Sequence, residues 1–343
     1  QSVLVVGSSL RKDHPLFAQR IRQAARKGCT VMSIDAVARD WAMPVAQTLL
    51  AAPGAWAQAL ADVAAVVAQE KGVAPPVKEG LADNETARAI ALALLAGEHK
   101  AVLLGNAAAH HAQATSLLAL ANWIGAQTGA TVGYLTEAAN TVGAQWVHAM
   151  PGEGGLNAAQ MLEGGLKGLF LLNNEPVYDS AAAAQAVAAL SKVDMVVTLS
   201  PFKTNMEFSD VLLPIAPFTE TSGSFVNAEG LLQSFHAVVR PLGETRPAWK
   251  VLRVLANLMD LPGFDFETSQ DVLAKATGAN AGQVNAVPAE RLGNATPVAP
   301  HVTTGAVAEP VVASIYKLDG LVRRASSLQL TADARLAREG ASA

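Results

Sequence analysis

The sequence contains only one cysteine, Cys29, among its 343 residues. A single thiol cannot form a disulfide framework within the chain, and it favours a reducing compartment. It also excludes an iron–sulfur cluster or a structural zinc site built from this chain's own thiolates, because both need several. The ordinary interpretation of Cys29, at the start of a predicted strand, is a small buried thiol.

Charge is also scarce, and long apolar runs are missing. Charged residues make up 16% of the chain, with a net charge of −4, so there is no basic stripe of the kind that binds nucleic acid. No apolar run reaches the roughly 18–20 residues that a membrane span needs, and no secretory signal segment opens the sequence. We therefore expect neither nucleic-acid binding nor direct membrane insertion. A hydrophobic content of 51% indicates a globular protein, and the length allows two or three domains.

What the sequence does contain is an alternation of short strands and helices. Val3–Val6 is β-branched and ends at Gly7, a helical pattern follows over Leu16–Lys27, and Cys29–Ile34 is again a strand pattern. A strand, a helix and a strand with no room for a hairpin predict a βαβ unit and therefore a parallel sheet. Because a strand begins at residue 2, we expect the chain to be a fragment whose upstream part is missing.

The pattern continues to about residue 260. Helices are expected at 55–71, 85–97, 113–128, 181–190 and 247–259, and strands at 101–104, 168–172 and 195–199. The glycine-rich stretch 129–168 is expected to be irregular, with a short helix near 157–162. After Leu261 the pattern weakens into an extended, proline-spaced tail with a short helix at Ala332–Arg338. The predicted fold class is α/β, with two doubly wound, mostly parallel α/β units and an extended C-terminal tail. Their predicted bounds are 1–76, with Pro75-Pro76 as the boundary, then 77–262 and 263–343.

One internal similarity supports two related units. "VLVVGSSLRKDHP" and "LFLLNNEPVYDS" both give a strand, a polar loop and a helix, and the strands that follow are "VMSID" and "VVTLS". We expect the units to pack about a shared crevice, where doubly wound folds place ligands.

No candidate for chemistry is convincing. Gly7-Ser8-Ser9 is half of a phosphate-cradling loop, but no G-x-G-x-x-G follows a strand, and Gly152-Glu153-Gly154 lacks the third glycine, so plain turns are the better interpretation. His110-His111 point to different sides of a helix and fit a solvated helix start better than a metal site. Ser224 lacks the G-x-S-x-G elbow of a nucleophile. The remaining histidines are isolated in sequence: His14, His99, His148, His236 and His301.

The pair Arg323-Arg324 is left open between a solvated pair and a contact with an acidic partner surface. We therefore assign no catalytic, cofactor-binding or metal-binding residue.

The segment from Ser209 to Phe235, "SDVLLPIAPFTETSGSFVNAEGLLQSF", carries a specific resemblance. The order "SDVLLP", Glu220, Gly223, Asn227, Glu229-Gly230 and Gln233, then "PLGETRPAW", resembles the late segment of the molybdopterin oxidoreductase family. "VVGSSLRKDHPLFAQRIRQAARKGCTVMSIDA" is similar to the family's dinucleotide-cradling βαβ unit, and "ALANWIGAQTGA" to its middle helix. The resemblance covers residues 2 to 260 and implies the two-unit fold of that family.

The departures from the family concern its cofactor. Catalytic members follow the Glu-Gly pair with arginine, where this chain has Leu231, and they place G-x-N-P after the first strand, where it has Gly7-Ser8-Ser9-Leu10. The family usually has an arginine two residues after the strand-end aspartate, but none stands two residues after Asp35 here. The loop Asn173-Asn174-Glu175-Pro176 lacks the glycine that the family has there. No thiolate, selenocysteine or serine is placed for a metal, and we expect the family's closing β-barrel domain to be absent.

This pattern, with the tail "IYKLDGLVRRASSLQLTADAR", resembles the large iron–sulfur subunit of bacterial NADH:quinone oxidoreductase, respiratory complex I. The resemblance implies a non-catalytic scaffold without molybdenum and iron–sulfur clusters in a missing N-terminal region. It also implies other peripheral-arm subunits as partners and a peripheral location on the cytoplasmic side of the bacterial inner membrane. Two alternatives stay open: a fragment of an active, formate dehydrogenase-like molybdopterin enzyme, and a stand-alone nucleotide-binding α/β protein.

Two further expectations concern the hairpin segment and the tail. In the Ser209–Phe235 segment, which we expect to pack the two units together, Asn227 and Glu220 should bind backbone groups, and Gly223 and Gly230 should hold conformations costly to other residues. In the tail, the part before Pro310 should wrap its own domain, and the part after it should reach a neighbouring subunit. Its apolar residues are Val311, Val312, Ile315, Tyr316, Leu318, Leu321, Val322, Leu328 and Leu330.

Overall fold

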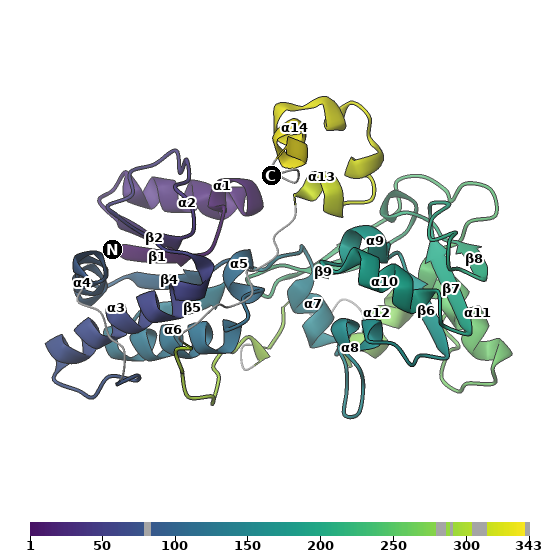
Figure 1. Ribbon diagram of the computed structural model, residues 1–343. Coiled ribbons are helices and arrows are strands. Elements are labelled where there is room, and N and C mark those ends of the chain that lie inside the picture. The colour runs from purple at the N-terminus through teal and green to yellow at the C-terminus, as the bar shows by residue number, and fades with distance from the viewer. Residues whose placement is uncertain (79–83, 279–285, 289–290, 304–313, 340–343) are drawn as a thin grey trace. The chain divides into compact units, whose positions relative to one another are not determined.

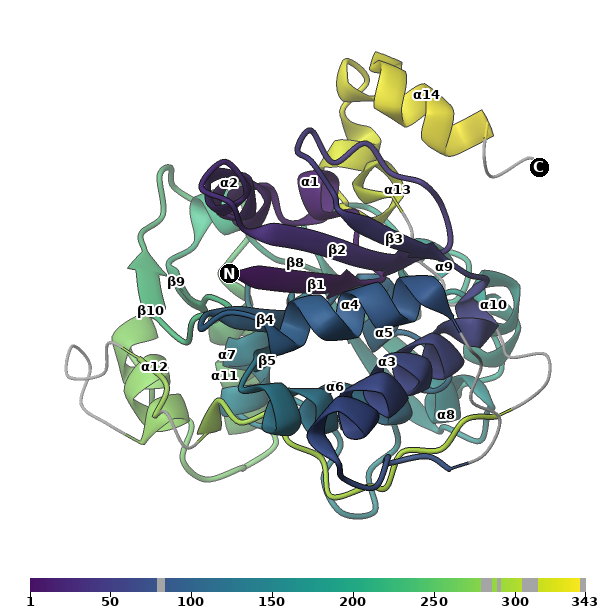
Figure 2. The same cartoon turned by 90° about the vertical axis from the view of Figure 1, so that its left-hand side faces the viewer.

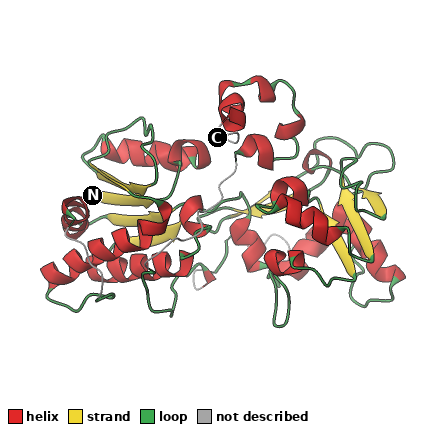
Figure 3. Cartoon of the chain, in the orientation of Figure 1, coloured by secondary structure: helices red, strands yellow, loops and turns green. Residues whose placement is uncertain are grey.

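The structure is a computed structural model of the chain. It describes all residues except 79–83, 279–285, 289–290, 304–313 and 340–343 (Figure 1). The chain divides into two compact units. Unit 1 is made of Gln1–Ala138 and Leu292–Val312, and unit 2 of Ala139–Arg291 and Ala313–Ala343. Both units combine helices with strands, as Figure 3 shows by colour.

Unit 1 is built on a five-stranded parallel sheet in the order β3-β2-β1-β4-β5. The order reverses between β1 and β4, which is the switch point of a doubly wound sheet. Figure 2 shows α2 on one face of the sheet and α3, α4 and α6 on the other. The strands are β1 (Ser2–Val6), β2 (Thr30–Asp35), β3 (Gln47–Leu50), β4 (Lys100–Leu104) and β5 (Thr131–Tyr134), and the helices α1 (Leu10–Asp13), α2 (Pro15–Ala25), α3 (Trp56–Lys71), α4 (Glu85–Leu95), α5 (Asn106–Ala109) and α6 (Ala114–Thr128).

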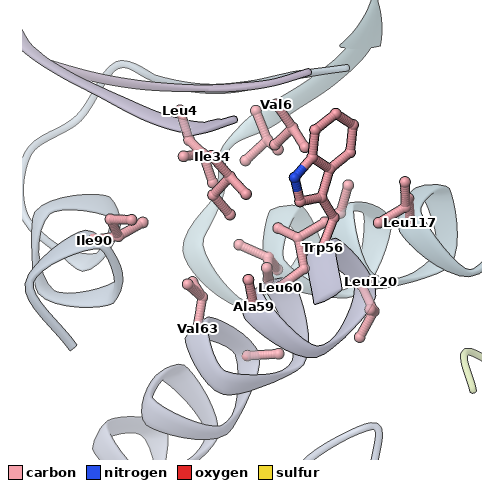
Figure 4. Packing of buried hydrophobic residues seen from close by; sticks show 14 of the residues in the cluster. Leu4, Val6, Ile34, Trp56, Ala59, Leu60, Val63, Ile90, Leu117 and Leu120 are labelled. Carbon is pink, nitrogen blue, oxygen red and sulfur yellow. The ribbon is translucent and has the colours of Figure 1, made fainter. Parts of the chain in front are cut away.

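The core of unit 1 is centred on α3, a helix that is apolar on most of its circumference. Its buried side chains pack between the sheet and the neighbouring helices α4 and α6 (Figure 4). A helix that is apolar almost all round is stable only when other elements enclose it. At its first residue, the Trp56 side chain is 1% exposed and its Nε1 donates to the Ala51 carbonyl oxygen at 3.0 Å.

Unit 2 has a three-stranded parallel sheet in the order β6-β7-β8 and an antiparallel hairpin, β9–β10. Residues near α10 pack on one face of the sheet, and residues of α11 pack on the other. The strands are β6 (Gly168–Leu172), β7 (Met195–Ser200), β8 (Val211–Pro214), β9 (Gly223–Val226) and β10 (Leu232–Phe235), and the helices α7 (Thr141–Trp146), α8 (Ala158–Leu162), α9 (Pro176–Asp179), α10 (Ala183–Leu190), α11 (Ala248–Leu258), α12 (Ser269–Thr277), α13 (Ile315–Leu318) and α14 (Ala332–Glu339), with short 3-10 turns at Phe218–Glu220, Val322–Arg324 and Leu328–Leu330. A further 3-10 turn, Pro53–Ala55, belongs to unit 1.

The predicted fold class, two mostly parallel α/β units, is confirmed, but the predicted boundaries are not. The predicted division at residues 76 and 77 is wrong, because β4 and β5 extend the same sheet as β1. Pro75-Pro76 lies only in the connection between α3 and α4, which pack against each other. The division falls instead after Ala138.

The segment after Leu261 was predicted to be extended, and this is wrong for much of it. A capping box of Thr268 and Asp271 starts α12, which belongs to unit 2. Residues 314–339 form α13, two 3-10 turns and α14, the last of which was predicted. Between these helices, 292–303 packs on unit 1: Asn294 Nδ2 donates to the Val132 carbonyl oxygen at 2.9 Å, and Ser116 Oγ lies 3.0 Å from His301 Nδ1. This agrees with the expectation that the part before Pro310 wraps its own domain; Val311 and Val312 lie outside the described residues.

Candidate functional site

The switch point of unit 1, between β1 and β4, is closed by its own loops. Gly7 has φ +61°, and a Cβ there would lie 2.7 Å from the Trp56 ring and 2.9 Å from the Ala108 nitrogen. Gly105, after β4, packs directly on Ser8, and the Ala107 nitrogen donates to the Gly7 carbonyl oxygen at 3.1 Å. Because neither glycine has a side chain, the two loops pack against each other and not against a ligand.

The loop Gly7-Ser8-Ser9 fits a phosphate group poorly, because two of its three amides donate to acceptors within the chain. A phosphate cradle offers free N–H groups at a helix start. Here the Gly7 nitrogen donates to the Ile34 carbonyl oxygen at 2.9 Å, and the Ser9 nitrogen donates to Asp13 Oδ2 at 3.2 Å. Ser8 Oγ and Asn106 Oδ1 have no partner in the described part of the chain, but packing shuts both atoms from solvent.

The corresponding loop of unit 2 repeats this arrangement. The Glu175 nitrogen, after β6, donates to Asp179 Oδ2 at 2.7 Å. In both loops the amide just before a four-residue helix binds the aspartate at the end of that helix. A carboxylate of the chain thus takes the position that suits an anion at a helix start. The two loops that resemble each other in sequence therefore also share a geometry.

Asp35, the last residue of β2, is another carboxylate that is bound within the chain. The residue is 2% exposed, and its Oδ1 accepts from the Ala36 nitrogen at 2.7 Å. Arg39 Nε lies 2.5 Å from Asp35 Oδ2. An arginine is therefore present near Asp35 after all, four residues along the chain, and its guanidinium is held by that aspartate.

The arginine pair of the C-terminal segment, Arg323-Arg324, binds the strand-end loop of unit 2. Arg324 Nη1 lies 2.9 Å and Arg323 Nη2 lies 3.1 Å from Glu175 Oε1, and Arg323 Nη1 lies 3.6 Å from Asp179 Oδ1. We call Glu175, Asp179, Arg323 and Arg324 the arginine clasp. The pair is thus not solvated: its acidic contact is provided by the same chain.

Two aromatic rings complete the clasp. The Arg323 guanidinium lies 4.4 Å from the centre of the Tyr178 ring, and that of Arg324 lies 4.1 Å from the Phe202 ring. The side chains of Glu175 and Arg323 are 6% and 10% exposed. Both guanidinium groups are stacked and hydrogen-bonded, and that of Arg323 is nearly buried, although its Nε has no partner in the described part of the chain. Arg324 is 34% exposed, so the clasp is a partly buried ion pair. The clasp therefore attaches residues 314–339 to the end of β6.

The clasp should make this attachment sensitive to acid. Burial raises the pKa of Glu175, but hydrogen bonds from Arg324 and Arg323 and the charge of Arg323 lower it by more, so the pKa lies below its ordinary value. The stabilisation is therefore present above the ordinary glutamate pKa of about 4.3 and is lost as the pH falls through the lower folded-state value. We expect hydrogen exchange of residues 314–339 to accelerate below about pH 4 more than that of α3. Parallel acceleration of both segments would contradict this.

The histidines are dispersed. His110 Nε2 lies 2.7 Å from Glu137 Oε2 on the surface, as predicted, but the residue caps the C-terminal end of α5 and does not start a helix. The same prediction is wrong for His111, which is 4% exposed, stacks on Trp56 and contacts the Pro53 carbonyl oxygen at 2.8 Å, because the chain turns inward after α5. His14 Nε2 lies 2.8 Å from the Thr136 carbonyl oxygen. Among the described residues, no three His, Cys, Asp or Glu side chains gather as a metal site would need.

The other residues considered as candidates from the sequence are Ser224, Cys29 and the Gly152-Glu153-Gly154 turn. Ser224 Oγ lies 2.8 Å from Ser234 Oγ across the hairpin. Cys29 is half-buried rather than fully buried, and desolvation raises the pKa of its thiol. Gly152-Glu153-Gly154 forms an exposed turn.

The hairpin β9–β10 has the predicted internal bonds. Asn227 Oδ1 accepts from the Glu229 and Leu231 nitrogens at 3.0 and 2.9 Å, and Glu220 Oε2 accepts from the Leu242 nitrogen at 2.9 Å. Gly230 has φ +82°, as expected. Gly223 is required for a different reason, since a Cβ there would lie 2.6 Å from the Phe235 ring. The hairpin's expected role in packing the two units together stays a prediction.

Gly230→Val should lower the free energy of unfolding by about 1 kcal/mol or more, because valine is strained at a positive φ. Gly152→Val is the matched control, since Gly152 has no positive φ and a Cβ would meet no atom within 4 Å. Denaturant unfolding of both variants measures the difference. Equal stability of the two would show that the turn imposes no such constraint.

Comparisons with known proteins place these observations in context. The family model described as Molybdopterin oxidoreductase matches residues 1–258. A Bacillus subtilis (strain 168) protein named as an oxidoreductase is 31% identical over 136 residues, which are 38% of this chain and 14% of that protein. A Staphylococcus aureus (strain bovine RF122 / ET3-1) protein named as a formate dehydrogenase is 38% identical over 80 residues, 23% of this chain and 8% of that protein.

Among solved structures, acetylene hydratase from Pelobacter acetylenicus shares the fold, with a TM-score of 0.58 and 14% identity over 81% of this chain and 50% of that one. The chain thus spans half or less of the length of these relatives. None of the helices in the described part of the chain combines the length and apolar character of a membrane span.

Proposed function

This chain belongs to the molybdopterin oxidoreductase family, and on that premise we propose that it is a scaffold region that has kept the family fold without the cofactor. The observation that supports this most strongly is the self-filled anion position in both strand-end loops. Asp13 binds the Ser9 amide, and Asp179 binds the Glu175 amide. A phosphate at either place would compete with a carboxylate that is tethered four residues away.

Two more observations support the same proposal. Trp56 and Ala108 pack against Gly7 at the switch point, and Arg39 binds Asp35 at the end of β2. These contacts support the proposal that the residues present do not fit a pterin dinucleotide. The arrangement is typical of a rigid region instead, since the ends of β1, β2 and β6 are fixed by hydrogen bonds and close packing.

We further propose that the scaffold belongs to the large iron–sulfur subunit of a proton-translocating NADH:quinone oxidoreductase. The sequence of the C-terminal segment and the lost arginine and glycine positions support this assignment. The iron–sulfur clusters would then lie in other parts of the polypeptide, and this region would support electron transfer from NADH to quinone without taking part in it. This region would then lie in the peripheral arm of the complex, on the cytoplasmic side of the bacterial inner membrane.

The C-terminal segment offers a surface for a neighbouring subunit. The clasp holds one side of it, and large apolar side chains remain exposed, among them Ile315 (62%), Leu330 (64%) and Leu336 (62%). Exposed apolar residues that gather on one segment are typical of a protein contact. We therefore assign the predicted partner contact to the exposed side of residues 314–339.

Affinity purification of the full-length protein from its natural host tests this proposal. We expect NADH-oxidising, quinone-reducing subunits to co-purify, and Leu330→Lys with Leu336→Lys to reduce their yield at least severalfold. Leu242→Lys, at an exposed site (78%) elsewhere in unit 2, is the control. Co-purification with a formate-oxidising activity instead would favour the second candidate, a formate dehydrogenase-like enzyme, which the Staphylococcus aureus relative suggests.

A further inference from the structure

Unit 2 contains a cavity that is separate from the strand-end loops and from the clasp. It has a volume of about 250 Å³ and lies among α7, the β9–β10 hairpin, α11 and α12. This is slightly below the range of about 300–1,000 Å³ that is typical of small-molecule sites. Much of its wall is apolar or aromatic, including Trp146, Val226, Leu232, Phe235, Trp249 and Leu273.

A polar cleft of about 540 Å³ adjoins this cavity. The two share lining residues, Ser222, Trp249, Ser269 and Gln270, so Trp249 stands where one passes into the other. Of these, Ser222, Trp249 and Ser269 are half-buried. An apolar pocket and a polar cleft are therefore joined end to end.

The cleft carries an excess of positive charge. Arg240, Arg246 and Lys250 line it, against the carboxylates of Glu220 and Glu267. Glu220 already accepts a hydrogen bond from the Leu242 nitrogen. Lys250 Nζ lies 5.3 Å from the centre of the Trp249 ring, which brings a cation to the mouth of the apolar cavity.

We propose that the cavity and the cleft form one binding site for a small anionic amphiphile. A carboxylate or phosphate head would bind at Lys250 and Arg240, and a short apolar chain or ring would pass Trp249 into the cavity. Burial of the apolar part supplies most of the affinity, and the cations select the sign of the head group. This inference is independent of the proposed scaffold function, because no residue of the strand-end loops or of the clasp lines the site.

Calorimetric titration of the purified chain tests the site with ligands that share one tail. The ligands are decanoate, decyl phosphate and decyltrimethylammonium, each below its micelle concentration. We expect saturable binding of the first two at one molecule per chain and at least tenfold weaker binding of the cationic ligand. The anion that binds more tightly, decanoate or decyl phosphate, identifies the preferred head group. Similar affinity for anionic and cationic heads, or no binding of either anion, would overturn the proposal.

Two variants locate the site. Arg240→Glu with Lys250→Glu should raise the dissociation constant for decyl phosphate at least tenfold, whereas Lys275→Glu, on an exposed part of α12 that does not line the site, should leave it within twofold. Ala276→Phe, on the wall of the cavity, should weaken the binding of decanoate more than that of acetate. Unchanged melting temperatures show that the variants are folded. Undiminished binding by both site variants would place the ligand elsewhere and refute the assignment.

Discussion

Glu175→Ala is expected to lower the free energy of unfolding of the chain by about 3 kcal/mol and to release the C-terminal segment. The side chain of Arg323 is 10% exposed and bonded to Glu175, so removing the carboxylate leaves a nearly buried guanidinium without its main counter-ion. Breaking a buried pair from one side costs about 3–5 kcal/mol, and the partial exposure of Arg324 (34%) favours the lower end. Denaturant unfolding and hydrogen exchange of residues 314–339 measure the two effects.

Two comparisons separate the clasp from a general loss of structure. Glu163→Ala removes an exposed glutamate of the same unit and should change stability by less than about 0.5 kcal/mol. Replacing Glu175, Arg323 and Arg324 together by methionine should cost less than Glu175→Ala alone, since no nearly buried charge is then left unpaired. Asp179 loses Arg323, but its side chain is 24% exposed and still accepts from the backbone nitrogen of residue 175. If the triple variant is the less stable of the two, the clasp does not act as a buried ion pair. Unchanged protection of residues 314–339 in Glu175→Ala would show that the segment is held by other contacts.

Trp56→Ala is expected to cost about 3–5 kcal/mol, the usual range for removing a large buried aromatic side chain. The Trp56 ring packs against Gly7, stacks on His111 with 5.7 Å between ring centres, and donates to the Ala51 carbonyl oxygen. Its removal leaves both a cavity at the switch point and an unpaired carbonyl group. Chemical denaturation measures the loss.

Leu92→Ala is the control for this prediction. Leu92 lies on α4 in the same unit, but 42% of its surface is exposed, so its truncation should cost much less. Comparable losses for the two variants would mean that Trp56 is not part of a close-packed core.

Local patterns in the sequence predicted the local structure well. The strands at Val3–Val6 and Gly168–Leu172 and the helix at 55–71 lie within a residue of the observed β1, β6 and α3, because β-branched runs and helical periodicity act over neighbouring residues. The strand β5 and the helix α7 were missed inside the stretch predicted to be irregular. β5 is only four residues long and contains Gly133, so it depends on pairing with β4, a non-local contact.

In the candidate site, too, contacts between neighbouring residues could be predicted, whereas contacts between distant residues could not. The aspartates that bind the strand-end amides lie four residues from their partners, so a serine or glutamate followed four positions later by aspartate was a signal in the sequence that could have been found. The clasp joins Glu175 to Arg324 across 149 residues, and a separation of that size leaves no trace in a single sequence. An acidic contact for Arg323-Arg324 could be expected from charge, but its location within the chain could not.

The metal and pterin content of the full-length protein tests the central proposal most directly. The protein is produced in cells that supply the molybdenum cofactor, beside an active member of the family as a loading control. Elemental analysis for molybdenum and tungsten and fluorescence of the oxidised pterin are then measured on both. The self-filled strand ends predict that the control is loaded and that this protein carries neither metal nor pterin above background. Stoichiometric molybdenum or tungsten together with pterin would contradict the proposal that the family fold here is a scaffold without cofactor.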